Sequence, residues 1–185
     1  MPAKKQVPKE AILIASLSLL RNGGIEALTI KEVAKKLGCS TQPVYLSFEG
    51  MEELRLETTK EAQRFFINYL KASKENPANL YGLRYIRFAK EESNLFKFLF
   101  MRQNAFSELR EALAPIMDGS ISQIMEQYHI EQEEAHHFHD QLWVHTHGIA
   151  SMIATGFCDW NMDKVQKMLS ECEQYLSRKY GEQNV

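Results

Sequence analysis

Throughout this chain, apolar residues recur at intervals of three and four, and no stretch alternates apolar and polar residues for long. The first such segment carries Ile12, Ala15, Leu19 and Leu20, which fall on one face of a helix. This pattern predicts an all-α protein of about nine helices. The first is expected to begin near Pro8 and end at Gly23-Gly24, and the others to span 29–37, 41–46, 52–74, 79–92, 94–102, 105–128, 132–155 and 161–179.

The composition of the 185-residue chain is that of a globular protein, with 44% hydrophobic and 25% charged residues. No apolar run approaches the roughly 18 residues that span a bilayer. The N-terminal MPAKKQVPKE leads into a helix without a secretory cleavage site. Cys39, Cys158 and Cys172 are far apart and form no CxxC pair, which disfavours a disulfide framework or a metal knuckle. We therefore expect a reduced, cytoplasmic protein with no membrane segment, metal or cofactor.

The segment GCSTQPVYLSFEGMEEL (38–54) contains a predicted helix of barely two turns. Isolated helices under about 12 residues are marginal in water, so the protein must need this surface. Thr29 and Glu32 form a capping box for the helix before it, and Gly38 is expected to end that helix. Ser40 is predicted to cap the short helix, with Pro43 in its first turn.

Two short helices joined by a tight turn form a helix-turn-helix, here at 29–48. The second helix of this motif lies in the DNA major groove, with its N-terminal residues near base edges. Val44 and Phe48 are expected to pack inward and to leave Thr41 and Gln42 exposed. Gln forms bidentate bonds with adenine, and Thr bonds bases or contacts a thymine methyl group.

The residues TIKEVAKKLGCSTQPVYLSF (29–48) resemble the helix-turn-helix of TetR-type (tetracycline-repressor-like) transcriptional regulators. The resemblance covers about residues 8–56 and rests on residues that share the spacing of the family pattern: Thr29, Val33-Ala34, Gly38, Cys39, Ser40, Tyr45 and Phe48. It implies a DNA-binding domain at 1–50 and a ligand-binding and dimerisation domain at 51–185.

The resemblance also implies roles for single residues. Thr29, Ser40 and Tyr45 would bond phosphates, and Thr41, Gln42 and Pro43 would face bases. Ser47, Lys5 and Lys9 complete the expected DNA-binding set. Capping alone also explains Thr29 and Ser40, and Tyr45 is alternatively a core residue. The family usually has a phosphate-binding Lys at the position of Met51, so one phosphate contact is expected to be lost.

Charge is unevenly distributed along the chain. Residues 1–48 hold seven Lys and Arg against three acids, whereas residues 75–185 hold ten against sixteen. A basic head on an acidic body suggests a polyanionic partner at the head only. A chance fluctuation of solvated charge is the alternative.

Aromatic and methionine residues are dense in the second domain and suggest a pocket for an unknown small, mostly apolar ligand. The candidate lining is Tyr85, Phe88, Phe96, Phe100, Met117, Met125 and His145; an ordinary aromatic core is the alternative. His136, His139 and Asp140 share a predicted helix face and are either a metal site or, as we expect, exposed surface.

The last two predicted helices carry small and apolar residues suited to a two-fold, four-helix dimer interface. The expected interface residues lie outside each subunit's own core: Trp143, Ile149, Met152, Ile153, Val165, Met168, Leu169, Cys172 and Leu176. A dimer would place two heads on a palindromic operator in double-stranded DNA.

These observations predict a dimeric DNA-binding transcriptional regulator, and specifically a repressor that a small molecule releases. An adaptor that kept the fold but lost DNA binding is one alternative, favoured by Met51. A helical-bundle enzyme is the other, but the chain shows no nucleophile–base constellation and no Gly-rich phosphate loop.

Overall fold

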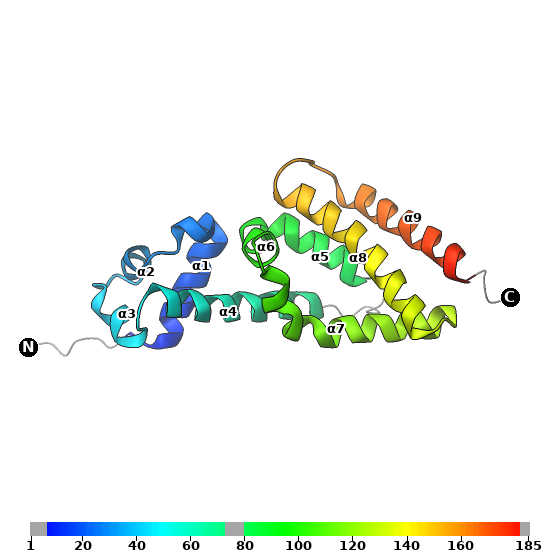
Figure 1. Cartoon of the computed structure of the whole chain (residues 1–185). Coiled ribbons are helices and arrows are strands. Elements are labelled where there is room, and N and C mark those ends of the chain that lie inside the picture. The colour runs from blue at the N-terminus through cyan, green and yellow to red at the C-terminus, as the bar shows by residue number, and fades with distance from the viewer. Residues whose placement is uncertain (1–6, 73–79, 182–185) are drawn as a thin grey trace, which may run out of the picture.

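The computed structural model describes residues 7–72 and 80–181, and these ranges contain helices and no strand (Figure 1). The helices are α1 (Lys9–Ala27), α2 (Ile30–Lys36), α3 (Gln42–Ser47), α4 (Met51–Lys71), α5 (Leu80–Glu91), α6 (Ser93–Phe100), α7 (Ala105–Tyr128), α8 (Gln132–Ala154) and α9 (Met162–Gly181). The predicted all-α fold is confirmed, and most helix limits fall within one or two residues of those expected.

The first helix differs from the prediction at its end. Gly24 leaves the helical conformation, with φ of 70° and ψ of −168°, but the chain then resumes a turn and continues to Ala27. The left-handed φ is one that glycine adopts without strain. Gly23-Gly24 therefore kinks α1 where the sequence predicted that the helix would end.

The head is a small core built from α1, α2, α3 and the start of α4. Ile12, Val33, Val44 and Leu54 are completely buried, and Phe48 is 2% exposed. Each of these side chains comes from a different helix or from the end of one, so the core holds the short α3 against its neighbours. Because α4 contributes Leu54, the head includes the first turn of the helix that leads into the body.

The body is a bundle in which α8 packs against α5, α7 and α9 (Figure 1). Its centre is aromatic: Phe66, Phe88 and Phe96 are fully buried and Tyr85 is 2% exposed. Edge-to-face pairs such as Phe66–Phe88, with ring centroids 4.9 Å apart, add about 1 kcal/mol each beyond their burial. A smaller cluster at the far end packs Phe138 on Tyr128, with ring centroids 4.9 Å apart.

Head and body are joined along α1, α4 and α6. Leu20 of α1 is fully buried in the core of the body. On the surface, Arg21 of α1 pairs with Glu92, and the side-chain amide of Asn94 donates to the carbonyl of Arg21 at 2.9 Å. These contacts fix the head on the end of the bundle.

A search of the described helices finds none with the length and apolar character needed to cross a membrane.

Candidate nucleic-acid interface

Hydrogen bonds fix both ends of α2, and those at its C-terminal end form the turn into α3. Thr29 is the N-cap, and its Oγ1 accepts a hydrogen bond from the backbone N–H of Glu32 at 3.2 Å. After α2, Gly38 adopts a left-handed φ of 66°, its N–H donates to the Lys35 carbonyl, and the Cys39 N–H donates to the Ala34 carbonyl at 3.0 Å. This is a Schellman motif, and it turns the chain sharply into α3.

Thr41, and not Ser40 as the sequence predicted, is the N-cap of α3. The Thr41 carbonyl accepts hydrogen bonds from the N–H groups of Val44 and Tyr45, at 3.1 and 3.2 Å. Pro43 occupies the first turn, where its missing N–H costs nothing. The N-cap is one residue later than predicted, and the Thr41 side chain makes no capping hydrogen bond.

One side of α3 is buried and the other is open to solvent. Val44 is fully buried and Phe48 nearly so, whereas Tyr45 is 58% exposed. The exposure of Tyr45 excludes the alternative that it is a core residue. Of the remaining predicted DNA contacts, Thr29, Ser40, Thr41 and Gln42 are exposed, and Pro43 and Ser47 are half-buried.

Leu46 is an exposed residue of α3 that the sequence analysis did not single out. It is 79% exposed, although it is apolar and lies in the last turn of the helix. Its distance of four residues from Gln42, on the same helix face, is the sequence signal by which it could have been found.

The predicted basic contacts are only partly available. Lys5 lies outside the described residues. Lys9 lies 3.5 Å from Glu53 of α4, and its ammonium group also lies 4.7 Å from the ring centroid of Phe48. Met51 is half-buried against the head core, at the first position of α4.

The body contains a cavity of about 90 Å³ between α4, α5, α7 and α8. Two of the predicted pocket residues, Tyr85 and Met117, line it, together with Phe66, Leu70, Tyr81, Gly82, Leu113, Ile116, Ser120, His139, Leu142, Trp143 and Thr146. The other predicted residues lie elsewhere: Phe88, Phe96 and Phe100 in the core, Met125 in the far cluster, and His145 half-buried on α8.

His147 is the histidine that faces the aromatic core, and the sequence analysis did not select it. Its Nδ1 lies 2.8 Å from the hydroxyl of Tyr85, and its ring stacks on Trp143 with centroids 5.8 Å apart. Burial lowers the pKa of His147 and raises that of Tyr85. The hydrogen bond therefore joins a neutral imidazole to a neutral phenol. Trp143, four residues earlier, shares this helix face and was the available signal.

His136, His139 and Asp140 do not form one exposed face. His139 is 9% exposed and lines the cavity, while His136 and Asp140 are exposed. Burial lowers the pKa of His139, although the Asp140 carboxylate 3.8 Å away opposes that shift. Within residues 7–72 and 80–181, no three His, Cys, Asp or Glu side chains are grouped closely enough to hold a metal ion.

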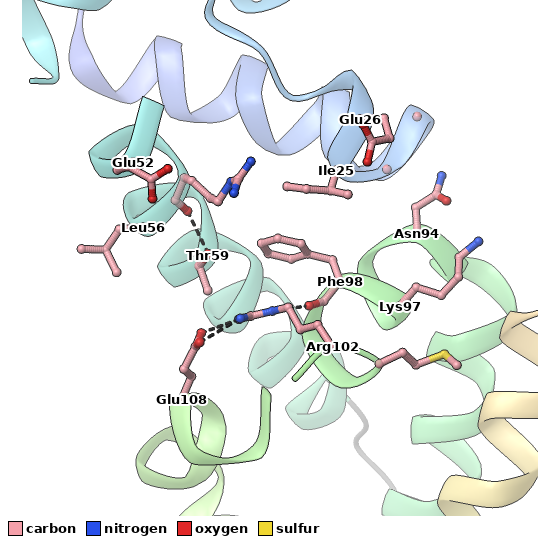
Figure 2. A pocket seen from close by; sticks show the side chains of 14 residues that line it. Ile25, Glu26, Glu52, Leu56, Thr59, Asn94, Lys97, Phe98, Arg102 and Glu108 are labelled. Carbon is pink, nitrogen blue, oxygen red and sulfur yellow. Dashed lines mark hydrogen bonds and ion pairs between the residues drawn. The ribbon is translucent and has the colours of Figure 1, made fainter. Parts of the chain in front are cut away.

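A larger groove of about 720 Å³ lies where the head meets the body (Figure 2). The end of α1 lies on one side of the groove, α4 on another, and α6 with the start of α7 opposite. Arg102 crosses its floor: Nε donates to the Phe98 carbonyl at 2.8 Å, and Nη1 donates to Glu108 at 2.8 Å. Because its lining mixes Arg and Lys with Glu, the groove favours neither charge.

Most of the predicted dimer residues belong to the subunit's own core. Ile149, Val165 and Leu176 are buried, at 4%, 0% and 2% exposure. Trp143, Ile153, Met168, Leu169 and Cys172 are half-buried and pack against the subunit's core clusters, which leaves Met152 as the exposed member of the set. The expectation that the set lies outside the subunit's own core is wrong for these buried members, because α9 turns its apolar stripe toward α8 and α5. A dimer through the last two helices stays a prediction.

A different apolar surface is exposed on the last two helices. Val144 and Met152 of α8 are 68% and 41% exposed, and Tyr175 of α9 is 68% exposed. Val144, Gly148 and Met152 follow one another at intervals of four, so they share a helix face.

Comparisons with known proteins agree with this architecture. The family model "Bacterial regulatory proteins, tetR family" matches residues 12–58, and "Tetracyclin repressor-like, C-terminal domain" matches residues 80–171. No curated protein matches the chain.

Two similar solved structures cover nearly the whole chain. One is a putative transcriptional regulator TetR family protein from Vibrio parahaemolyticus, with 17% identity, a TM-score of 0.66, and coverage of 90% of this chain and 96% of that one. The other is the fatty acid degradation regulator FadR from Bacillus halodurans, with 15% identity, a TM-score of 0.62, and coverage of 94% and 97%. Both matches show a shared fold. With both domains matched in order and the helix-turn-helix in place, this chain belongs to the TetR family of DNA-binding transcriptional regulators.

Proposed function

We propose that this protein is a homodimeric transcriptional repressor that binds a palindromic operator through α3 and is released by a small, mostly apolar ligand. The observation that carries the proposal is that one face of α3 is buried and the other is exposed to solvent. Val44 and Phe48 anchor the helix in the head, while Thr41, Gln42 and Tyr45 are exposed. In the domain division proposed from the sequence, 1–50 binds DNA in the cytoplasm and 51–185 binds the ligand and the second subunit.

The exposed residues have the chemistry that each DNA contact needs. Thr41 and Gln42 lie at the N-terminal end of α3, the part of a recognition helix that meets base edges. The hydroxyl groups of Thr29, Ser40 and Tyr45 are suited to phosphate oxygens, which position a protein on the duplex without reading its sequence. Pro43 and Ser47 lie beside them, and Lys9 is within reach of the phosphates once it leaves Glu53.

A dimer is proposed because a recognition helix of six residues makes few contacts alone. Protein–DNA complexes with specific affinities of about 10⁻⁸ M or tighter usually bury at least about 1,000 Å² of protein surface. A single small module buries less than this. The face of Val144, Gly148 and Met152 on α8, with Tyr175 on α9, is the surface we assign to the partner subunit. Gly148 has no side chain and so allows close helix approach.

The ligand is proposed to enter the cavity between α4, α5, α7 and α8. Its walls are mostly apolar, with the hydroxyl groups of Ser120 and Thr146 and the imidazole of His139 as polar groups. At about 90 Å³ the cavity is smaller than the roughly 300–1,000 Å³ of most ligand pockets. A ligand must therefore push the lining helices apart, and the flexible Met117 is suited to make way. Phe66 and Leu70 of α4 line the cavity, and Leu54 of the same helix is buried in the head core, so that displacement would reach the head through α4.

The regulator is distinguished from an adaptor by salt-dependent binding to duplex DNA. Fluorescence anisotropy of a labelled random-sequence duplex should show weak binding that falls steeply as salt rises, because phosphate contacts release counterions. Selection from a randomised pool should then yield a palindromic sequence bound far more tightly. An adaptor would bind no duplex at low salt, and that result would refute the proposed function.

The ligand site is tested with the compounds that co-purify with the protein from cell extract, identified by mass spectrometry. A compound that releases the wild-type protein from DNA should fail to release Met117→Trp, whose indole fills the cavity. Met101→Trp is the matched control, because Met101 lines the larger groove and not the cavity. If only the control loses the response, the groove is the ligand site.

A further inference from the structure

Leu46 is the most solvent-exposed residue among the apolar side chains of the head. It is 79% exposed, compared with 70% for Ile14 and 55% for Leu56. The buried side of α3 is already supplied by Val44, with Phe48 directly after the helix. Leu46 therefore contributes little to the head core, and its apolar surface remains in water in the free protein.

The position of Leu46 continues the surface that faces DNA in the proposed function. Leu46 follows Gln42 by four residues and Pro43 by three, so the three side chains share one face of α3. Four residues advance a helix by about 6 Å, which is about two base-pair steps along the duplex. Leu46 is thus placed to meet a base pair about two steps from the one that Gln42 reaches.

The residues of α3, QPVYLS, include no charged side chain. Arginine and lysine make the commonest specific contact to guanine, so this helix lacks that means of reading G·C pairs. Its amide suits adenine, which presents N6 and N7 in the major groove. The one apolar feature that the major groove offers is the C5-methyl group of thymine.

We propose that Leu46 is a specificity-determining residue that contacts a thymine methyl group, and that α3 reads an A·T-rich part of each half-site. This inference rests on the proposed function, because it requires α3 to lie in the major groove. Burying one methyl group against an apolar side chain should change affinity by about fourfold in each half-site.

The test removes the methyl group from the DNA and the apolar side chain from the protein, separately and together. Each thymine of a selected operator is replaced by deoxyuridine, symmetrically in both half-sites, and the affinity is measured for wild type and for Leu46→Ala. In wild type, one thymine position per half-site should be sensitive to the loss of its methyl group. In Leu46→Ala that sensitivity should disappear. Wild type and Leu46→Ala should bind the uracil-containing duplex with similar affinity.

Ile14→Ala is the matched control, because Ile14 is an apolar residue of α1 that is 70% exposed. It should retain the wild-type dependence on thymine methyl groups, and circular dichroism should show that all variants fold. Methyl sensitivity that persists in Leu46→Ala, or that is absent in wild type, overturns this inference while leaving DNA binding intact. A wild-type protein that binds no duplex at all overturns the proposed function as well, so the two failures are distinct.

Discussion

Arg21 near the end of α1 and Glu92 at the start of α6 form a two-point ion pair between the head and the body. Nε of Arg21 donates to Oε2 of Glu92 at 2.9 Å, and Nη2 donates to Oε1. The hydrogen bond to Glu92 raises the pKa of Arg21, which favours the charged guanidinium group. The guanidinium carbon also lies 4.7 Å from the ring centroid of Phe65 in α4. One side chain thus connects three helices at the junction of the two domains.

Arg21→Gln should lower the free energy of unfolding by about 1 kcal/mol, because the Glu92 carboxylate loses its charged partner. Only 13% of the Glu92 side chain is exposed, so water compensates incompletely. Urea denaturation measures the change. Lys35→Gln breaks an exposed pair with Glu32 and should change stability by less than about 0.5 kcal/mol. If the two substitutions lowered the free energy of unfolding equally, the Arg21–Glu92 pair would not stabilise the contact between head and body.

The burial of His147 makes stability dependent on pH. Burial lowers the pKa of His147 in the folded protein below the value of about 6.5 in an unfolded chain. As pH falls below about 6.5, the unfolded state therefore binds a proton first, and stability is lost until the folded pKa is reached. His147→Gln should lose less stability than wild type between pH 7 and pH 5, measured by chemical denaturation.

His139 contributes with the same sign, because burial lowers its pKa as well. The double variant His139→Gln, His147→Gln should therefore show a flatter pH dependence than either single variant. An unchanged slope in the double variant would show that the acid-sensitive groups lie elsewhere.

The exposed face of α8 is predicted to hold the dimer. Met152→Glu should place a carboxylate on that face twice across the two-fold axis, at a cost of several kcal/mol. Because Met152 is 41% exposed in the subunit, the chain itself should still fold. Sedimentation should then show a folded monomer. Tyr175→Glu tests the contribution of α9 in the same way. If both variants remained dimeric at micromolar concentration, the interface would lie on another surface.

Met51→Lys is predicted to restore a phosphate contact at the start of α4. Binding to any duplex should tighten, and the slope of log affinity against log salt should steepen by about one for each subunit. Met51→Gln, which adds no charge, is the control. A salt slope that Met51→Lys leaves unchanged would mean that this residue points away from the phosphates.

The local signals in the head allowed most of its fold to be predicted from the sequence. Thr29 before Glu32, and Gly38 after Leu37, mark helix ends through hydrogen bonds within a few residues. The structure contains the Gly38 turn and the bond from the Glu32 N–H to Thr29. The second bond of the predicted capping box is replaced, because the Thr29 N–H donates to the Ala27 carbonyl at 3.1 Å. The N-cap of α3 was misplaced by one residue, because the prediction rested on the capping preference of Ser40, whereas the actual N-cap, Thr41, makes no side-chain capping bond.

Side-chain direction within the body was harder to predict, because it depends on contacts distant in sequence. His145 and His147 are both compatible with an inward-facing α8, and only packing against α5 selects His147. The apolar stripe of α9 was likewise assigned to a partner. In the structure, Val165 is buried in the main core of the same subunit, and Leu176 is buried in the cluster formed with α7 and α8. Periodicity identifies an apolar helix face, but it does not identify the surface that covers that face.

The central claim is that the exposed face of α3 reads DNA, and two substitutions separate base reading from phosphate binding. Gln42→Ala should weaken operator binding by about 1–3 kcal/mol and relax the base preference at one position in each half-site. Tyr45→Phe, which removes a single hydroxyl group from a side chain that is 58% exposed, should weaken binding to all sequences alike.

The most direct measurement is a binding titration of wild type, Gln42→Ala and Tyr45→Phe against a selected operator and its single-base variants. The account predicts that Gln42→Ala loses discrimination at one base pair per half-site, while Tyr45→Phe keeps every preference at a lower affinity. If both variants bound the operator and all its variants with wild-type affinity, α3 would not be the reading helix.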